Sequence, residues 1–323
     1  MAQEADKLIT VIGGSGFVGR HLVRALAQRG FRVRPAVRRP DLAGHLQPLG
    51  SVGQIMPVQA NLRYPDSVLA ACQGADVVIN LPGVLYNSGA QSFSAIHAFG
   101  AEAAARAAKQ AGAAFIQMSA IGADAASTSA YARTKAEGEA RARSVLPDTM
   151  IVRPSVVFGP EDDLFNRFAS LARMAPALPL IGGGGTLFQP VFVGDAADGM
   201  ARLAADPAAH GGKTFEFGGP EEMTFRQIIE FTLETTGRKR ILAPIPFAIA
   251  KMMAAVLGLL PKPQLTMDQV ELLRYDNVVS AAAKADNRTL EGLSITPQGI
   301  EAIVPSYLYR YRRAGQFSRT TNA

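Results

Sequence analysis

The sequence predicts an α/β fold: a doubly wound parallel sheet with helices on both faces, followed by a smaller and mostly helical C-terminal lobe. Three observations support this prediction. Short β-branched runs alternate with helical segments through the first half of the chain, a glycine-rich turn joins the first run to the first helix, and the alternation ends near residue 159. The 323 residues are 48% hydrophobic, which is enough for a large buried core and excludes a disordered chain.

The alternation begins with the run Leu8–Gly14, followed by an amphipathic helix over Phe17–Gly30 that ends at a glycine. Further strands are predicted at 32–38, 54–61, 76–81, 114–120 and 149–159, with helical segments between most of them. Successive parallel strands need crossover connections, which are usually helices. This order therefore predicts a parallel sheet covered on both faces.

The pattern changes after residue 160. We expect a Pro/Gly-rich loop at 175–185, short strands near 189–194 and 213–219 that return to the sheet, and a helix that starts at Asp195. The sequence therefore predicts a first domain over 1–160 and a smaller, interleaved lobe over 161–323. A basic tail forms the end of this lobe, over 306–323.

The composition excludes several classes of protein. The single cysteine, Cys72, cannot form an internal disulfide. We expect no signal peptide, and the longest apolar stretch, 246–260, is shorter than the roughly 20 residues of a spanning helix. The formal net charge is +6, but basic and aromatic residues interleave only in the tail, so nucleic acid is not an expected partner. The four histidines share no ligand spacing, and no metal is expected.

The strongest motif lies between the first strand and the first helix, where Gly13, Gly16 and Gly19 form a G-x-x-G-x-x-G pattern. Gly13 allows the tight turn, Gly16 lets backbone N–H groups approach a pyrophosphate, and Gly19 lets the helix pack closely. The alternative is a purely structural turn. The position between a strand and a helix favours a dinucleotide site of the Rossmann type.

The end of the second strand indicates which dinucleotide is bound. NAD-binding folds place an acidic residue there, whereas this chain has Arg38 and Arg39. Two guanidinium groups suit a 2′-phosphate, so the predicted cofactor is NADPH or NADP+. The alternative is that both arginines are solvated residues at a strand end.

A Tyr-x-x-x-Lys pattern, Tyr131 and Lys135, opens the predicted helix after the fifth strand. This spacing places both side chains on one helix face, where the ammonium lowers the pKa of the phenol. A phenol tuned in this way can transfer a proton during hydride transfer to a carbonyl. In the alternative, Lys135 binds the cofactor ribose and Tyr131 only packs.

Four segments together resemble an atypical member of the extended short-chain dehydrogenases/reductases: GGSGFVG, the strand end Asn80–Gly83, YARTK and RPSVVFGP. More narrowly, the chain resembles the NAD(P)H-binding accessory subunits of respiratory complex I, the NADH:ubiquinone oxidoreductase, in their bacterial form. This second resemblance covers nearly the whole chain and is carried by 118–139, 153–173, 189–200 and 266–280.

The resemblance implies an NADPH that is held for stability and assembly rather than for turnover. The chain would be a membrane-associated, peripheral component of an electron-transport complex, on the cytoplasmic side of the bacterial inner membrane, in contact with other peripheral-arm subunits. Whether it is itself an enzyme stays open. The alternative is a free NADPH-dependent reductase or epimerase that acts on a small carbonyl or a nucleotide sugar.

The resemblance also implies roles for individual residues. Active members have a Ser or Thr just past the fifth strand, where this chain has Ser119 followed by Ala120. Tyr131, Lys135 and Ser119 are then vestigial catalytic residues that bind the cofactor. The expected cofactor contacts are Gly13, Ser15, Gly16, Phe17, Val18, Gly19, Arg38, Arg39, Asn61, Leu81, Pro82, Gly83, Tyr131, Lys135, Pro154 and Val156.

Two segments are candidates for partner contact. Within Phe247–Leu260, one helical stripe carries Ile249, Met253, Val256, Leu257 and Leu260. The segment is either a core helix or a face buried against another subunit or the membrane surface. The basic tail is either a solvated end or a segment that binds acidic protein or anionic lipid.

Overall fold

The computed structural model describes residues 7–83, 92–258 and 265–312. The chain divides into two compact units. The first comprises Met1–Pro154, Val193–Phe217 and Val279–Thr296, and the second comprises Ser155–Phe192, Gly218–Val278 and Pro297–Ala323. The chain therefore crosses from one unit to the other several times.

The first unit contains a sheet of seven parallel strands in the order β11-β6-β5-β4-β1-β2-β3. The strands are β1 (Leu8–Ile12), β2 (Arg32–Val37), β3 (Val58–Gln59), β4 (Val77–Asn80), β5 (Ala114–Met118), β6 (Met150–Pro154) and β11 (Thr214–Phe217). The strand order reverses between β1 and β4, which is where doubly wound folds bind ligands. This sheet confirms the predicted fold class.

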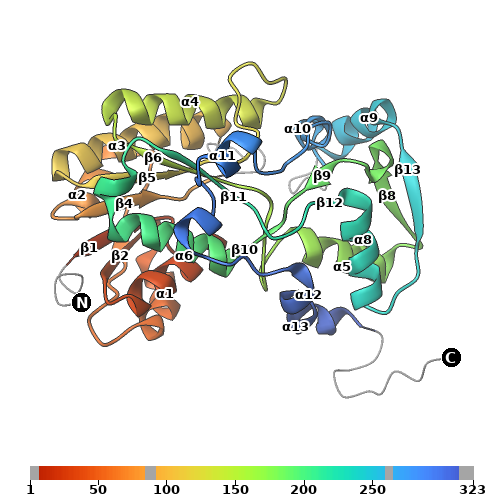
Figure 1. Ribbon diagram of the computed structural model, residues 1–323, viewed down its shortest axis with the longest axis horizontal. Helices are drawn as coiled ribbons and strands as arrows, with labels where there is room; N and C mark the ends of the chain where they lie inside the picture. Colours follow the sequence, from red (N-terminus) through yellow and green to blue (C-terminus); the bar gives the residue numbers. More distant parts are fainter. Residues whose placement is uncertain (1–6, 84–91, 259–264, 313–323) are drawn as a thin grey trace. The chain divides into compact units, whose positions relative to one another are not determined.

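Helices cover both faces of this sheet (Figure 1). One face carries α1 (Phe17–Gln28) and α6 (Val193–Ala205), and the other carries α2 (Pro65–Cys72), α3 (Gly100–Ala111) and α4 (Ala130–Val145). Small side chains on α3 are fully buried and let it lie close to the sheet. Because both faces are covered, the central strands are apolar on both sides, as the adjacent buried residues Val11 and Ile12 of β1 illustrate.

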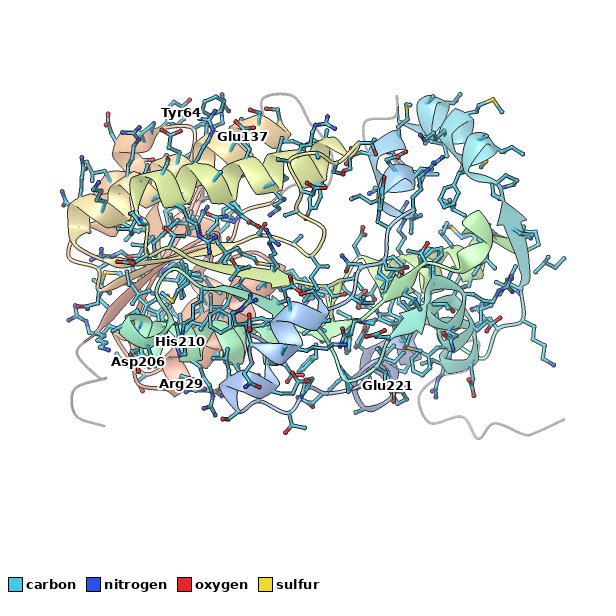
Figure 2. All side chains as sticks on the ribbon, turned by 45° about the horizontal axis from the view of Figure 1, so that its top comes forward. Arg29, Tyr64, Glu137, Asp206, His210 and Glu221 are labelled. Carbon is cyan, nitrogen blue, oxygen red and sulfur yellow. The ribbon has the colours of Figure 1, made fainter. Side chains whose placement is uncertain are left out.

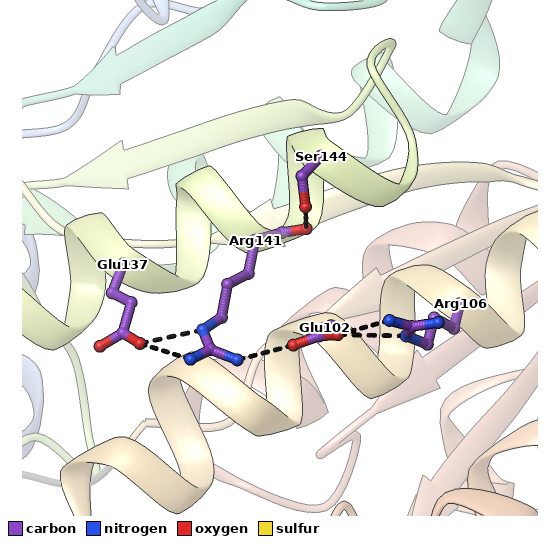
Figure 3. A network of polar contacts seen from close by, with 5 residues as sticks. All are labelled: Glu102, Arg106, Glu137, Arg141 and Ser144. Atoms are coloured by element: carbon purple, nitrogen blue, oxygen red, sulfur yellow. Dashed lines mark hydrogen bonds and ion pairs between the residues drawn. The ribbon is translucent and has the colours of Figure 1, made fainter.

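Polar contacts hold α4 in place. Arg141 forms ion pairs with Glu137 on its own helix and with Glu102 on α3, and Glu102 also pairs with Arg106 (Figure 3). On the sheet side, Arg153 of β6 donates two hydrogen bonds to Glu139, at 2.8 and 2.7 Å. Exposed ion pairs contribute little individually, but this partly buried bidentate pair fixes the helix against the sheet.

The second unit combines short strand pairs with helices. The pairs are β7 (Val157–Phe158) with β10 (Val191–Phe192), β9 (Leu187–Phe188) with β12 (Met223–Thr224), and β8 (Ala177–Ile181) with β13 (Ile241–Ile245). The helices are α5 (Leu164–Met174), α8 (Phe225–Thr235), α9 (Phe247–Leu257), α10 (Met267–Leu272), α12 (Ile300–Ile303) and α13 (Pro305–Leu308). The first unit also contains the short helices α7 (Pro207–His210) and α11 (Ala281–Ala285).

Polar residues connect distant segments of the second unit. The Oδ1 atom of Asn277 accepts from the Ser155 hydroxyl at 2.7 Å and from the Val156 backbone N–H at 3.1 Å. The buried carboxylate of Asp162 accepts from the Tyr307 hydroxyl at 2.5 Å. These bonds attach the segment before α11 and the C-terminal helices to the strands of this unit.

Several sequence predictions need correction. The expected strand 149–159 is two strands, β6 and β7, because Ser155 turns to bond Asn277 instead of extending the sheet. The expected loop 175–185 contains β8, and Pro179 is tolerated because β8 has only one strand partner. Helix α6 starts at Val193, which puts Asp195 in its first turn. The segment 213–219 does contribute β11 to the large sheet, whereas 189–194 contributes β10, which pairs with β7.

Candidate functional site

Most of the predicted site residues lie at one edge of the first unit. In a parallel sheet, the carboxyl ends of all strands meet at the same edge. The glycine loop follows β1, Arg38 and Arg39 follow β2, Asn61 follows β3, Leu81–Gly83 follow β4, Ser119 follows β5, and Pro154 ends β6. Val156 belongs to the second unit and is not part of this group.

The glycine loop brings the start of α1 against the end of β1. Gly13 has φ +83°, and a Cβ atom on Gly19 would lie 2.3 Å from the carbonyl oxygen of Gly13, so a larger residue at position 19 would force the helix away. A Cβ atom on Gly16 would meet only the oxygen of Gly13, at 3.3 Å. A side chain at position 16 would occupy the open space beside the N-terminus of α1.

The N-terminus of α1 suits an anion. Among the described residues, no side chain caps this terminus and its first turn has no acidic residue. The first N–H groups of a helix lack partners within the helix, and its dipole attracts negative charge. The open space beside Gly16 and the uncapped terminus therefore fit the pyrophosphate of a dinucleotide.

The two arginines after β2 differ in their surroundings. Arg39 forms an ion pair with Asp41 at 2.6 Å, and this hydrogen-bonded guanidinium lowers the pKa of the Asp41 carboxyl. Arg38 is exposed and makes no hydrogen bond or ion pair with any residue that the structure describes. From the sequence alone, Arg38 and Arg39 are equally good candidates for the contact with a 2′-phosphate.

Next along this edge, Asn61 and Pro82 have structural contacts of their own. The Oδ1 atom of Asn61 accepts from the backbone N–H of Arg63 at 3.1 Å, which holds the turn after β3. The ring of Pro82 lies 3.1 Å from the position of a Cβ atom on Gly13, so the end of β4 packs directly against the glycine loop.

Two buried polar atoms at this edge have no hydrogen-bond partner among the described residues: Oδ1 of Asn80 and Oγ of Ser119. Asn80 uses its Nδ2 to donate to Gln117 at 2.8 Å. By strand alternation, Ser119 lies on the same side as Phe115, which packs in the cluster formed with α2, α3 and α4. Buried polar atoms without partners are rare, and here they fit a polar ligand.

The Tyr131 and Lys135 side chains do lie close together on α4. The Nζ atom of Lys135 is 5.7 Å from the centre of the Tyr131 ring and 3.1 Å from the position of a Cβ atom on Gly83. Lys135 is only 5% exposed, and burial lowers its pKa from 10.5 to about 8. A buried ammonium beside a phenol and an unsubstituted backbone position is an arrangement suited to ribose hydroxyls or to proton transfer.

Sequence reasoning missed His97, which is 2% exposed and lies between Phe93 and Tyr131. Burial, together with the charge of Lys135, lowers its pKa to about 3, so the imidazole is neutral at pH 7. His97 stands in a π-helical segment, Ser94–Phe99, and such segments are frequent at functional sites. A single histidine in an alanine-rich stretch carries no motif, so only the structure identifies it.

The described residues contain no group of three or more His, Cys, Asp or Glu that could hold a metal ion. Asp206 caps the start of α7, and His210 is the last residue of this short helix (Figure 2).

Within 7–83, 92–258 and 265–312, the structure has no helix with both the length and the apolarity to span a bilayer.

A comparison with known families identifies the family of this chain. The model of the NAD dependent epimerase/dehydratase family matches residues 9–218, which include the whole strand edge described above. The chain belongs to this family. This membership supports NAD(P) binding by the chain.

Similarity to individual proteins gives a more specific classification of the chain. The chain is 35% identical to "NADH dehydrogenase [ubiquinone] 1 alpha subcomplex subunit 9, mitochondrial" of Arabidopsis thaliana over 95% of this chain and 78% of that protein. This match confirms the resemblance to complex I subunits. The ceramide reductase of Caulobacter vibrioides is 37% identical, over 56% of each chain.

A solved structure supports the fold. The triphenylmethane reductase of Citrobacter sp., crystallised with NADP(H), superposes with a TM-score of 0.72 at 16% identity and covers 93% of this chain and 99% of that chain. At this level of identity, the similarity extends to the fold alone.

The buried lysine leads to a stability prediction. We expect Lys135→Met to make the ligand-free protein more stable at pH 7, by up to roughly 3 kcal/mol, because folding lowers the pKa of this ammonium from 10.5 to about 8. Below pH 8 both the folded and the unfolded state carry the proton and the penalty is complete. Between pH 8 and 10.5 the folded state loses the proton first, so the wild type gains stability with rising pH.

Urea unfolding of both proteins across this pH range measures the effect. The stability difference between variant and wild type should shrink as the pH rises, and Lys109→Met, at an exposed position on α3, serves as the control. A Lys135→Met protein that is less stable than the wild type at every pH would contradict the prediction.

Proposed function

We propose that this protein is an NADPH-binding accessory subunit of a respiratory NADH:ubiquinone oxidoreductase, in which the cofactor stabilises the fold and the assembly instead of turning over. The observation that carries the proposal is the 35% identity to a named subunit of that complex over 95% of the chain. The glycine loop and the uncapped α1 terminus supply the means to hold a dinucleotide.

The proposed cofactor contacts follow the strand edge. Backbone N–H groups at Gly13–Gly19 bind the pyrophosphate, and Lys135 donates to ribose hydroxyls over Gly83. A bound nicotinamide supplies hydride chemistry. Ser119 and Tyr131 then act as ligands of the cofactor, which gives the unpartnered hydroxyl of Ser119 a polar neighbour. The remaining proposed contacts, all in the first unit, are Ser15, Phe17, Val18, Asn61, Leu81, Pro82 and Pro154.

The preference for NADPH over NADH rests on the arginines after β2. The ion pair with Asp41 holds Arg39, and it offsets part of that residue's positive charge. Arg38 has no such partner among the described residues. We therefore assign the main contact with the 2′-phosphate to Arg38, and a weaker, shared contact to Arg39.

For Arg38→Ala, we expect the Kd for NADPH to rise about 10- to 100-fold, because one charge-assisted contact is lost. The Kd for NADH, which lacks the 2′-phosphate, should stay the same. Arg39→Ala should have a smaller effect, and Arg29→Ala, at the end of α1 (Figure 2), should have none. Isothermal titration calorimetry with both dinucleotides measures these constants, and an equal loss for NADH would contradict the assignment.

The alternative function is a free reductase or epimerase. The match to the ceramide reductase supports it, as does the close approach of Lys135 to the Tyr131 ring. In an enzyme of this kind the phenol transfers a proton to or from the substrate oxygen, and loss of such a group typically costs about 10²- to 10⁴-fold in rate.

Tyr131→Phe separates the two functions. Under the proposed structural role, cells that carry this variant keep nearly normal membrane NADH:quinone activity and complex assembly, because no proton transfer is needed. Under the alternative, membrane activity is also unaffected, but the purified wild type reduces carbonyl compounds with NADPH and the variant does not. NADPH oxidation by the wild type, measured over a panel of aldehydes and ketones, therefore argues against the proposal.

The partner surface that we propose is the outer side of α9. This helix packs through the small, buried residues Ala250 and Ala254. Phe247 and Leu257 are partly buried, and the other large apolar side chains point outward, with exposed fractions of 46% for Ile249, 66% for Met252, 40% for Met253 and 69% for Val256. The spacing of these residues forms one stripe along the helix. This exposure favours an interaction face over a core helix. Leu260 and most of the basic tail (313–323) lie outside the described residues.

We assign this stripe to a contact with a neighbouring subunit of the complex, at the cytoplasmic side of a bacterial inner membrane. Exposed apolar patches of this kind usually mark interaction sites. Anionic lipid at the same surface, together with the tail, is the other partner to be tested.

A Met252→Glu/Val256→Glu variant should leave NADPH binding intact and abolish co-purification with membranes that carry NADH:quinone activity. Two carboxylates in the stripe cannot be buried against an apolar partner without a large desolvation cost. Lys109→Glu changes the net charge by the same amount on α3 and should co-purify normally. Binding of the purified wild type to anionic vesicles, lost in the same variant, would instead assign the stripe to lipid.

A further inference from the structure

His97 contacts Phe93, Tyr131 and Thr134, and it lies near the backbone position that Lys135 also faces. Its ring stacks on Phe93 at 5.5 Å between centroids and meets the Tyr131 ring edge-on at 5.3 Å. Its Nε2 atom lies 3.7 Å from the position of a Cβ atom on Gly83, where Lys135 Nζ lies at 3.1 Å. The imidazole and the ammonium therefore face the same unsubstituted point of the backbone.

The hydrogen bonds around Thr134 fix the proton on this ring. The Thr134 hydroxyl has a single hydrogen, and it lies 2.8 Å from the carbonyl oxygen of Ala130 and 3.1 Å from that of Tyr131. Its oxygen is therefore an acceptor for His97 Nδ1, at 3.1 Å. A neutral imidazole has one N–H group. With the Thr134 hydrogen directed at a backbone carbonyl oxygen, the bond between His97 and Thr134 requires the ring proton on Nδ1.

This arrangement connects His97 to both functional residues of α4. The ring contact limits the orientation of Tyr131, and the Nδ1–H bond holds the helical turn between Tyr131 and Lys135. Because the imidazole is neutral, it adds no positive charge beside the ammonium. The other charged groups close to Lys135 on these elements are Glu139 and, through Glu139, Arg153.

We propose that His97 is a positioning residue of the dinucleotide site, which orients Tyr131 and Lys135 toward the hydroxyl groups of the nicotinamide ribose. This inference rests on the proposed binding of NADPH. The sequence predicts a site formed by the glycine loop, the strand ends and α4. His97, from the segment before α3, is an additional residue of this site. The ligand group that these residues recognise is the pair of ribose hydroxyls, which requires a hydrogen-bond donor and a hydrogen-bond acceptor at defined positions.

The test compares His97→Phe with Thr134→Val in the purified full-length chain. Phenylalanine keeps the stacking on Phe93 and the contact with Tyr131 but cannot donate to Thr134, and valine keeps the shape of Thr134 without its hydroxyl. Each variant should raise the Kd for NADPH about tenfold, which is the effect of one hydrogen bond. The double variant should lose no more than either single variant, because both remove the same bond. Thr134→Ser, which keeps the hydroxyl, should bind like the wild type.

The second ligand is adenosine 2′,5′-bisphosphate, which has the adenosine half and its 2′-phosphate but no nicotinamide ribose. Its Kd should be the same in all of these proteins. An unchanged Kd for NADPH in both single variants would overturn the inference, and so would an equal loss for adenosine 2′,5′-bisphosphate, since that reports damage to the whole fold. If the wild type binds neither ligand, the proposed cofactor function itself fails.

Discussion

The site depends on one steric constraint: the backbone of α1 at Gly19 lies against the backbone of Gly13 at the end of β1. Only a residue without a side chain permits this approach. It brings the positive end of the helix dipole, and N–H groups that lack helical partners, to the edge where the order of the parallel strands reverses. The other strand ends then add their residues around a place where an anion is already favoured.

The opposite side of the site is held by different forces. An ammonium that is almost fully buried is unfavourable in the ligand-free protein, so α4 must be fixed by other contacts. The bidentate pair of Arg153 with Glu139 and the network around Arg141 supply them. Such a site suits a protein that is stabilised by its ligand, because hydroxyl groups of the ligand solvate the charge that folding has removed from water.

In the second unit, the sequence of α9 does not show which side of the helix is buried. Helix α9 carries a regular apolar stripe, and from the sequence such a stripe is equally compatible with a core helix and with an interface. In the structure, the fully buried positions are the alanines, which allow close contact with Ile181 and Val270, whereas the residues of the stripe from Ile249 to Val256 face outward. Periodicity identifies the stripe but not the side that is buried, since this depends on which neighbour packs against the helix.

The sequence by itself determined the parallel fold, the glycine loop and the placement of Tyr131 and Lys135 on one helix face, because each depends on local spacing. It did not separate Arg38 from Arg39, since the ion pair with Asp41 is a matter of side-chain geometry. It also gave no sign of His97 and missed β8, whose partner β13 is distant in the sequence. Only the tertiary structure decides such features, because burial and pairing depend on segments that the chain brings together from far apart.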